Sequence, residues 1–310
     1  MVRDRFIRGA SGALLSLPLL GEAAQGDLGS LSAQATPEPL VTPNGKFFEY
    51  SQMRMPTKAA TRAAGGAIEI DGLVDRPSRI SYDDLAHLPR VKRLLTLECY
   101  VNWAGGPLIF TTQFAGVPLA QLFQDAGVKE EARSVEIETF DGHPTFQLPL
   151  TELQRPGTML VAELGGIPVP VRHGGPYTRL MIPGAGGNHL PKWVKRIAFS
   201  DKKAPAHDAP PMAGFLSPAP PEARGSISGI TITGYAFSAP EPVAAIELST
   251  DGGATYQPLP QLPQPDPNVW ITWNVRFVPP RKGFYVLRVR ATSARRRKQE
   301  VPGTIAIEAA

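Results

Sequence analysis

Residues 94–119 read LLTLECYVNWAGGPLIFTTQFAGVPL and contain Cys99, the only cysteine of the 310-residue chain. The apolar run before Cys99 predicts a strand, and the pair Gly105–Gly106 predicts a loop soon after it. A strand that ends in a thiol can aim one soft ligand or one nucleophile at a cavity. Cys99 is therefore a candidate functional residue, with a small buried apolar residue as the equally common alternative.

Several classes of chemistry could use such a thiol. The chain contains no G-x-S-x-G motif, so a serine hydrolase has no support. His143, His173 and His189 follow Cys99 and could pair with it in a cysteine hydrolase, although five scattered histidines supply some partner by chance. A metal ligand, a cysteine nucleophile and a core residue of a non-catalytic exported binding protein therefore remain as alternatives.

The segment around Cys99 resembles the molybdenum-binding segment of the sulfite oxidase family of molybdopterin-dependent oxidoreductases. That family carries the pattern L-E-C-x-x-N, followed by W-x-G-V-P-L-x-x-L-L-x-x-A-G with Phe114 here in place of its tryptophan. The matching residues are Glu98, Cys99, Asn102, Gly116, Val117, Pro118, Leu119, Leu122, Ala126 and Gly127. The resemblance implies a molybdenum–molybdopterin cofactor with Cys99 as the protein ligand of the metal. A polarisable thiolate suits such a transition metal.

Three further segments resemble cofactor-binding parts of the same family. They are TPNGKFFEY at 42–50, VRHGGPYTRL at 171–180 and PGAGGNHLPKWVKRI at 183–197. An arginine fork and a lysine point charge suit a phosphate group, and glycines let backbone N–H groups approach it. The resemblance implies cofactor binding by Asn44, Phe47, Phe48, Cys99, Asn102, Asp141, His173, Arg179 and Lys192. Asp141 precedes Gly142, so an ordinary hairpin turn is the alternative for that residue.

The substrate is expected to differ from sulfite. Tyr50 and Ala104 occupy positions where sulfite-oxidising members of the family have arginines, and a small dianion needs such groups. We expect an uncharged S-oxide, N-oxide or other organic molecule lying against Tyr50, Tyr100 and Trp103. Tyr50 and Trp103 join Cys99 as predicted catalytic residues. The alternative within the family is a sulfite or sulfane-sulfur dehydrogenase.

The resemblance implies two-electron oxygen-atom-transfer chemistry on a small molecule, with electrons exchanged with a separate carrier. No C-x-x-C-H haem-attachment motif occurs in the chain, so that carrier would be another protein, such as a c-type cytochrome. The net charge of +4 comes partly from the run Arg295–Lys298, which is typical of a solvated loop. Nucleic-acid binding is not expected, because no supporting motif is present.

The first residues have the pattern of an export signal. Arg3, Arg5 and Arg8 precede an apolar Ala/Gly/Leu stretch that is shorter than the ~20 residues of a membrane span. The stretch 3–8 resembles the twin-arginine export pattern, with Asp4 in place of the second arginine. We expect a periplasmic protein in which residues 1–40 are export signal and linker; a disordered N-terminal arm is the alternative.

The remaining pattern predicts two domains. Residues 41–203 alternate strand signals with short helices at Ser81–Leu88 and Val117–Gly127, which indicates an α+β molybdopterin-binding domain. Residues 204–224 are rich in proline and predict a connector. Residues 225–310 carry short strands of period two, which predicts an all-β sandwich. Its segments resemble the immunoglobulin-like domain of the family, often used for dimerisation, and this suggests a homodimer.

Overall fold

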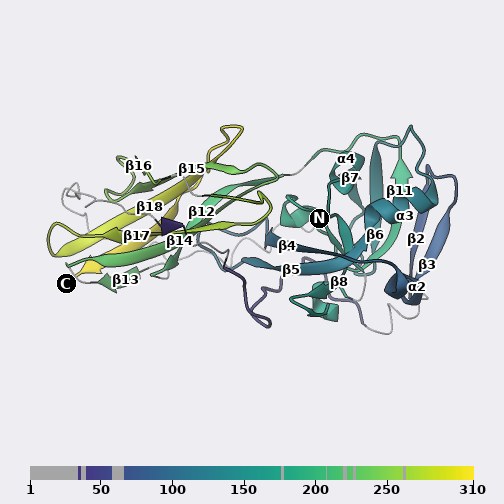
Figure 1. Cartoon of the computed structure of the whole chain (residues 1–310), viewed down its shortest axis with the longest axis horizontal. Helices are drawn as coiled ribbons and strands as arrows, with labels where there is room; N and C mark the ends of the chain where they lie inside the picture. The colour runs from purple at the N-terminus through teal and green to yellow at the C-terminus, as the bar shows by residue number, and fades with distance from the viewer. Residues whose placement is uncertain are drawn as a thin grey trace, which may run out of the picture.

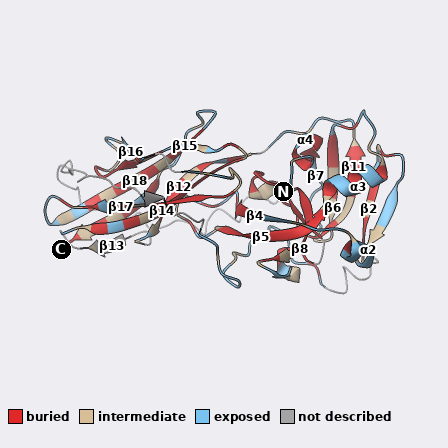
Figure 2. Ribbon diagram, viewed as in Figure 1, coloured by how far each residue is buried: buried red, intermediate tan, exposed pale blue. Residues whose placement is uncertain are grey.

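The computed structural model describes residues 34–35, 40–57, 66–175, 178–206, 208–218, 222–225, 228–260 and 263–310. These residues form two lobes that follow one another along the longest axis of the molecule (Figure 1). Buried residues concentrate on the sheets of both lobes (Figure 2). Each lobe has its own apolar core, and a smaller cluster lies between them.

The N-terminal lobe contains two five-stranded sheets. The first has the order β3 (Ser78–Ser81), β2 (Ala67–Gly72), β11 (Val194–Ser200), β6 (Ser134–Thr139), β7 (Phe146–Pro149). The second has the order β10 (Arg179–Met181), β8 (Met159–Leu164), β5 (Ile109–Pro118), β4 (Val91–Glu98), with β9 (Ile167–Pro168) paired to β8. The expected mixture of strands and short helices is present, with sheet predominating.

The α-helices of the described residues are short: α2 (Tyr82–His87), α3 (Leu119–Ala126) and α4 (Leu150–Leu153). Ser81 caps α2 in a capping box with Asp84, because its side chain accepts from the Asp84 N–H and Asp84 accepts from the Ser81 N–H. Gly127 ends α3 in the left-handed conformation that glycine adopts without steric cost. Both predicted helices are therefore confirmed within two residues at each end.

The strand that carries Cys99 is held by close pairing with its neighbour. β4 and β5 pair antiparallel from Val91–Gly116 to Glu98–Ile109. A buried hydrogen bond of 2.6 Å joins the hydroxyls of Thr96 and Thr111 across this pair. On the other side of β5, a Cβ at Gly116 would lie 2.2 Å from the Leu160 carbonyl oxygen, so glycine permits the approach of β8.

The C-terminal lobe is a two-sheet sandwich. One sheet has the order β1 (Gln34–Ala35), β17 (Ile271–Phe277), β14 (Ile230–Ala239), β12 (Ala209–Ser217). The other has the order β13 (Glu222–Gly225), β19 (Gly303–Ala309), β18 (Gly283–Ser293), β15 (Val243–Ser249), β16 (Gln257–Pro258). Trp273 and Phe277 from the first sheet and Leu287 and Val289 from the second share one core. The short strands expected in 225–310 from the period-two pattern are present, while the immunoglobulin-like assignment stays a prediction.

Three segments outside the expected range of the sandwich, 225–310, belong to it. The connector predicted at 204–224 contains β12, a nine-residue strand, and most of β13, which pairs with β19. The prediction of a connector is therefore wrong for Ala209–Ser217 and for 222–224. β12 lies at the edge of its sheet, and its register shifts between Ala209 and Met212, where Pro210 and Pro211 stand. Proline is tolerated at such edge irregularities because no ladder N–H is lost. The strand β1 lies within the predicted linker and pairs with β17.

Apart from Gln34–Ala35 and Leu40, the predicted export signal and linker lie outside the described residues. In the part of the chain that is described, no helix is long and apolar enough to cross a membrane.

Candidate active site

Cys99 follows the last residue of β4 and begins a tight loop that returns to β5. The Cys99 N–H donates to the Leu108 carbonyl at 2.9 Å, and the Asn102 N–H donates to the Cys99 carbonyl at 2.9 Å. The side chain is only 5% exposed. The expected strand-then-loop placement of the thiol is confirmed.

Asn102 holds the shape of this loop. Its amide nitrogen donates to Glu98 Oε1 at 3.0 Å, and its amide oxygen accepts from the Leu108 N–H at 3.0 Å. A Cβ at Gly106 would lie 2.4 Å from that same oxygen, so the loop closes only around a glycine. Asn102 therefore bridges the two ends of the Cys99 loop and does not line the cavity described next.

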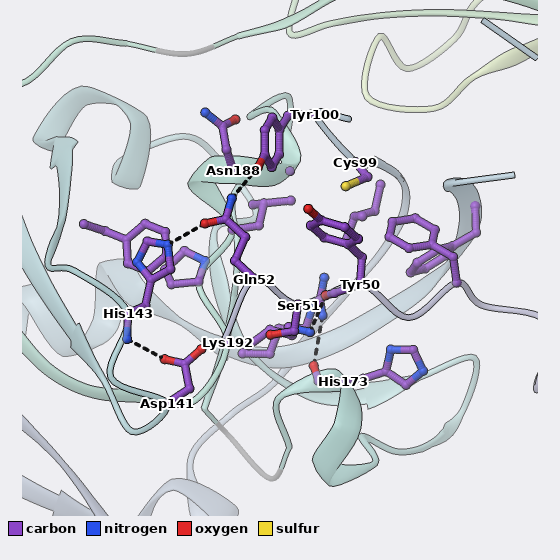
Figure 3. A pocket seen from close by; sticks show the side chains of 18 residues that line it. Tyr50, Ser51, Gln52, Cys99, Tyr100, Asp141, His143, His173, Asn188 and Lys192 are labelled. Atoms are coloured by element: carbon purple, nitrogen blue, oxygen red, sulfur yellow. Dashed lines mark hydrogen bonds between the residues drawn. The ribbon is translucent and has the colours of Figure 1, made fainter. Parts of the chain in front are cut away.

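A cavity of about 90 Å³ opens beside the Cys99 thiol (Figure 3). Its lining comes from the segment after Leu40, the Cys99 loop, the β6–β7 hairpin and the two glycine-rich stretches. The lining residues are Phe48, Tyr50, Ser51, Gln52, Leu97, Cys99, Tyr100, Phe110, Asp141, His143, Phe146, His173, Arg179, Gly187, Asn188, Leu190, Pro191 and Lys192. Residues 142 positions apart in the sequence, Tyr50 and Lys192, thus meet around one thiol.

Three basic side chains, His173, Arg179 and Lys192, form a basic trio on one side of this cavity. Burial lowers the pKa of Arg179 to about 10, and burial followed by repulsion from Arg179 lowers the pKa of His173 to about 4 and that of Lys192 to about 8. Arg179 Nη1 donates to the His173 carbonyl at 2.9 Å, and Lys192 Nζ donates to the Tyr50 carbonyl at 2.7 Å. At neutral pH the His173 imidazole is therefore uncharged, and the two cations that remain close together, Arg179 and Lys192, favour an anionic ligand.

Arg179 also carries a direct sign of such a ligand. Its Nε is buried and has no hydrogen-bond partner among the described residues. Buried N–H groups are nearly always paired, so an unpaired one next to a cavity indicates a group that binds there. Gly174, with φ +90°, lies where a Cβ would come within 3.1 Å of both Arg179 Cβ and Lys192 Cβ. The glycine lets the trio converge, and the residues present fit a bound phosphate group.

The rest of the lining, here called the polar wall, includes Tyr50, Gln52, Tyr100, Asp141 and His143, and Lys192 reaches it through its bond to the Tyr50 carbonyl. Gln52 lies between Tyr100 and His143, as Figure 3 shows, and its amide nitrogen donates to the Tyr100 hydroxyl. His143 Nε2 lies 3.1 Å from Gln52 Oε1. The Asp141 side chain accepts from the backbone N–H of His143 at 3.2 Å. Burial and then the Tyr100 hydroxyl raise the pKa of Tyr50, so this phenol stays neutral.

A buried carboxyl group lies directly behind the thiol. Glu98 is 6% exposed, and burial raises its pKa to about 8. Its Oε2 has no hydrogen-bond partner among the described residues, while Oε1 accepts from Asn102. Gly187 packs against the backbone of Glu98 and Cys99. A Cβ on Gly187 would lie 2.6 Å from the Glu98 backbone carbonyl oxygen and 2.9 Å from Cys99 Cα. The second glycine-rich stretch thus packs directly on the backbone of Cys99.

Seven of the eleven residues predicted for the site line the cavity: Phe48, Tyr50, Cys99, Asp141, His173, Arg179 and Lys192. Phe47 lies behind it, with its ring 4.8 Å from that of Phe110 and 6.2 Å from His173. Asn44 donates to the Gly165 carbonyl at 3.0 Å, away from the lining. Trp103 is 62% exposed, and the structure does not bring it to the cavity.

Sequence reasoning missed Ser51, Gln52 and Asn188 as lining residues, and it named His143 only as a possible partner of Cys99 in a hydrolase. Their signal was weak but present, because each lies within four residues of a predicted one: Tyr50, Asp141 or Lys192. Among the described residues, no three histidine, cysteine, aspartate or glutamate side chains come together as a metal site. The roles predicted for the individual residues stay predictions.

Comparison with known proteins identifies the N-terminal lobe. Residues 55–208 match the oxidoreductase molybdopterin-binding domain. Human mitochondrial sulfite oxidase is 26% identical over 282 residues, covering 73% of this chain and 51% of that protein. The catalytic subunit of the protein-methionine-sulfoxide reductase of Gluconobacter oxydans is 26% identical over 245 residues, covering 70% of this chain and 77% of that protein.

The fold has a counterpart among solved structures. The sulfane dehydrogenase SoxCD from Paracoccus pantotrophus superposes with a TM-score of 0.69 at 22% identity, covering 91% of this chain and 80% of that one. The chain spans about half the length of the sulfite oxidases it matches. The matched domain, and the cavity that its glycine-rich stretches build around one cysteine, show that the chain belongs to the sulfite oxidase family of molybdopterin-dependent oxidoreductases.

Proposed function

We propose that the protein is an oxidoreductase that transfers an oxygen atom to or from a small uncharged substrate, and that sulfite is not this substrate. The observation that carries the proposal is the cavity in which the Cys99 thiol, the basic trio and the polar wall with Tyr50, Tyr100 and Gln52 meet. When bound, the molybdenum cofactor supplies the two-electron redox chemistry. The residues of the chain bind it, orient it and select what reaches it.

The basic trio would hold the phosphate group of the cofactor. The unpaired Nε of Arg179 and the spare donors of Lys192 are charge-assisted hydrogen-bond donors suited to phosphate oxygens. Cys99 would be the protein ligand of the metal. Burial raises the pKa of the Cys99 thiol. A cysteine nucleophile needs a lowered pKa, so the raised value disfavours a cysteine hydrolase. A coordinated metal would instead deprotonate the thiol directly.

The polar wall supports an uncharged substrate. The Tyr50 and Tyr100 hydroxyls and the Gln52 amide can exchange hydrogen bonds with a neutral S-oxide or N-oxide oxygen. The name of the SoxCD structure gives a sulfane dehydrogenase. For this chain, a sulfane-sulfur substrate is the alternative candidate to test.

Electrons would pass to or from a separate carrier, such as a c-type cytochrome, in the periplasm after export. The absence of a C-x-x-C-H motif from the sequence supports a carrier that is a separate protein. We also propose that the β-sandwich is immunoglobulin-like and forms a homodimer. Size-exclusion chromatography with light scattering tests the dimer, since a monomer at micromolar concentration contradicts it.

Metal analysis and a pterin fluorescence assay test the enzyme class. We expect near-stoichiometric molybdenum and pterin in the full chain purified from cells that make the cofactor. Cys99→Ser should lose redox activity or retain less metal. Protein with neither molybdenum nor pterin would contradict the proposal and favour a non-catalytic exported binding protein.

A substrate panel tests the specificity. With a reduced viologen dye as donor, we expect turnover of small sulfoxides or N-oxides. With ferricyanide as acceptor, we expect negligible sulfite oxidation, because the polar wall offers the dianion no arginine fork. Rapid oxidation of sulfite at low concentration would overturn the assignment of the substrate class and leave the cofactor assignment intact.

A further inference from the structure

We propose that the C-terminal sandwich positions Cys99: it binds the chain on both sides of the cysteine, so that the sandwich is part of the metal-binding machinery. The role of Cys99 rests on the proposed function, but the contacts do not. The junction of the lobes lies at the ends of β4 and β5, as Figure 1 shows.

After Cys99, the loop contacts β12 and β14. The Gly105 N–H donates to the Tyr235 hydroxyl at 3.2 Å, and Tyr235 is 1% exposed within β14. A Cβ on Gly214 of β12 would lie 2.3 Å from the Gly105 nitrogen, so the backbones of the loop and the strand touch. The Met212 sulfur lies 3.9 Å from the Asn102 amide nitrogen.

Before Cys99, the outer edge of β4 contacts the segment 268–270. β4 is the last strand of its sheet, and an edge strand leaves N–H groups unpaired. The Thr96 N–H donates to the Asn268 carbonyl at 2.9 Å, and the Trp270 N–H donates to the Thr96 hydroxyl at 2.8 Å. The sandwich therefore completes the hydrogen bonding of the strand that carries the thiol.

The two contacts bracket the cysteine. Thr96 precedes Cys99 by three residues, and Gly105 follows it by six. Opening of the loop would break the bond to Tyr235, so the loop should open more often without that hydroxyl. A sandwich that served dimerisation alone would show no such coupling. Tyr235 thus acts as a positioning residue through the Gly105 backbone.

Alkylation of Cys99 in the full-length, metal-free protein tests the inference. The chain has one cysteine, so iodoacetamide uptake reports on this loop alone. Tyr235→Phe removes the hydroxyl and keeps the ring. The matched control is Tyr285→Phe, whose hydroxyl donates to the Arg281 carbonyl at 2.8 Å within the sandwich. We expect alkylation about fivefold faster in Tyr235→Phe, the effect of one lost hydrogen bond, and unchanged in Tyr285→Phe.

Equal alkylation rates in wild type, Tyr235→Phe and Tyr285→Phe would overturn the inference, as would the same acceleration in both variants. Gly214→Ala provides an independent arm, because its methyl group would displace Gly105, and it should accelerate alkylation at least as much. In metal-loaded protein, the electron paramagnetic resonance spectrum of Mo(V) should shift in Tyr235→Phe and not in Tyr285→Phe. If the protein binds no molybdenum, the proposed function fails while the alkylation arms still decide this inference.

Discussion

At the scale of single residues, Arg179 carries more of the assignment than Cys99 does. A buried thiol is common in proteins without any ligand, whereas a buried guanidinium with an unpaired Nε beside two other basic groups is costly without an anion. The neighbouring Arg172 shows the contrast, because it is half exposed and pairs with Glu49 at 2.8 Å. The two arginines therefore make a test and its control.

Arg179→Ala should lower the pterin content of the purified protein. Removal of charge-assisted bonds to a phosphate group is expected to weaken cofactor binding about tenfold or more. Arg179→Lys should restore part of the binding, because it keeps the charge and loses the planar fork. Arg172→Ala should leave pterin content unchanged. Full occupancy in a folded Arg179→Ala protein, with its melting temperature as the check on folding, would remove Arg179 from the site.

Asp251 provides a residue-scale prediction about pH. Burial acts to raise the pKa of this carboxyl, but the hydroxyl and N–H of Thr255 and the Ser249 hydroxyl outweigh it and lower the pKa to about 2, from an ordinary 3.8. A carboxyl with a lowered folded-state pKa stabilises the protein above its unfolded pKa, and the benefit disappears as pH falls from about 4 to about 2.

Asp251→Ala is therefore expected to cost about 1–3 kcal/mol of unfolding free energy near pH 7, because the buried Ser249 hydroxyl and the Thr255 N–H and hydroxyl lose their acceptor. Urea titrations at several pH values should show the wild-type advantage shrinking between pH 4 and pH 2. A difference between wild type and variant that stays constant over this interval would contradict the lowered pKa.

At the scale of elements, the sequence predicted the helix ends, because neighbouring residues alone determine a helix cap. Helix α2 begins after a serine with an aspartate three residues later, and α3 ends at a glycine. Strand β12 was missed because its two prolines have the composition of a linker, and only its place at the sheet edge makes them acceptable. Such a place depends on tertiary pairing, which no local pattern in the sequence records.

The site residues also divide into those that the sequence could predict and those that depend on tertiary structure. Phe48, Cys99, His173 and Lys192 could be predicted because their segments have the family's pattern. Gln52 could not be, since its position matters only where the segment 50–52 crosses between the Cys99 loop and the β6–β7 hairpin. Trp103 was predicted as a site residue because it is an aromatic side chain in the loop that follows Cys99. The Gly106 N–H donates to the Trp103 carbonyl, and the turn that this bond closes leaves the Trp103 indole exposed.

Removal of the α2 cap tests the element that the sequence predicted best. Ser81→Ala takes away the acceptor of the Asp84 N–H, whose bond is 3.0 Å, and should cost about 1 kcal/mol of unfolding free energy. Ser81→Asp, which can still cap, should cost much less. Chemical denaturation of both variants provides the measurement. Equal losses would mean that the serine stabilises the lobe by something other than capping.

At the scale of the whole molecule, the interface between the lobes resembles a small core. A buried cluster of Tyr235, Phe237, Val269, Trp270, Ala209 and Ala239 packs against Leu94 of β4 and Ile109 of β5. The Trp270 indole N–H donates to the Leu40 carbonyl at 3.0 Å across the same junction. Apolar packing and hydrogen bonds between lobes favour joint unfolding, since separating the lobes would expose this cluster to water.

Leu287→Ala tests this coupling from the far lobe. Leu287 is fully buried in the sandwich core, and its truncation should cost about 2–5 kcal/mol. If the lobes unfold together, the urea midpoint for Cys99 alkylation should fall along with the midpoint for tryptophan fluorescence. Ile137→Ala in the N-terminal core is the matched variant and should lower both midpoints as well. A Cys99 midpoint unchanged by Leu287→Ala would mean that the sandwich unfolds alone and that the cluster between the lobes contributes little to holding the cysteine strand.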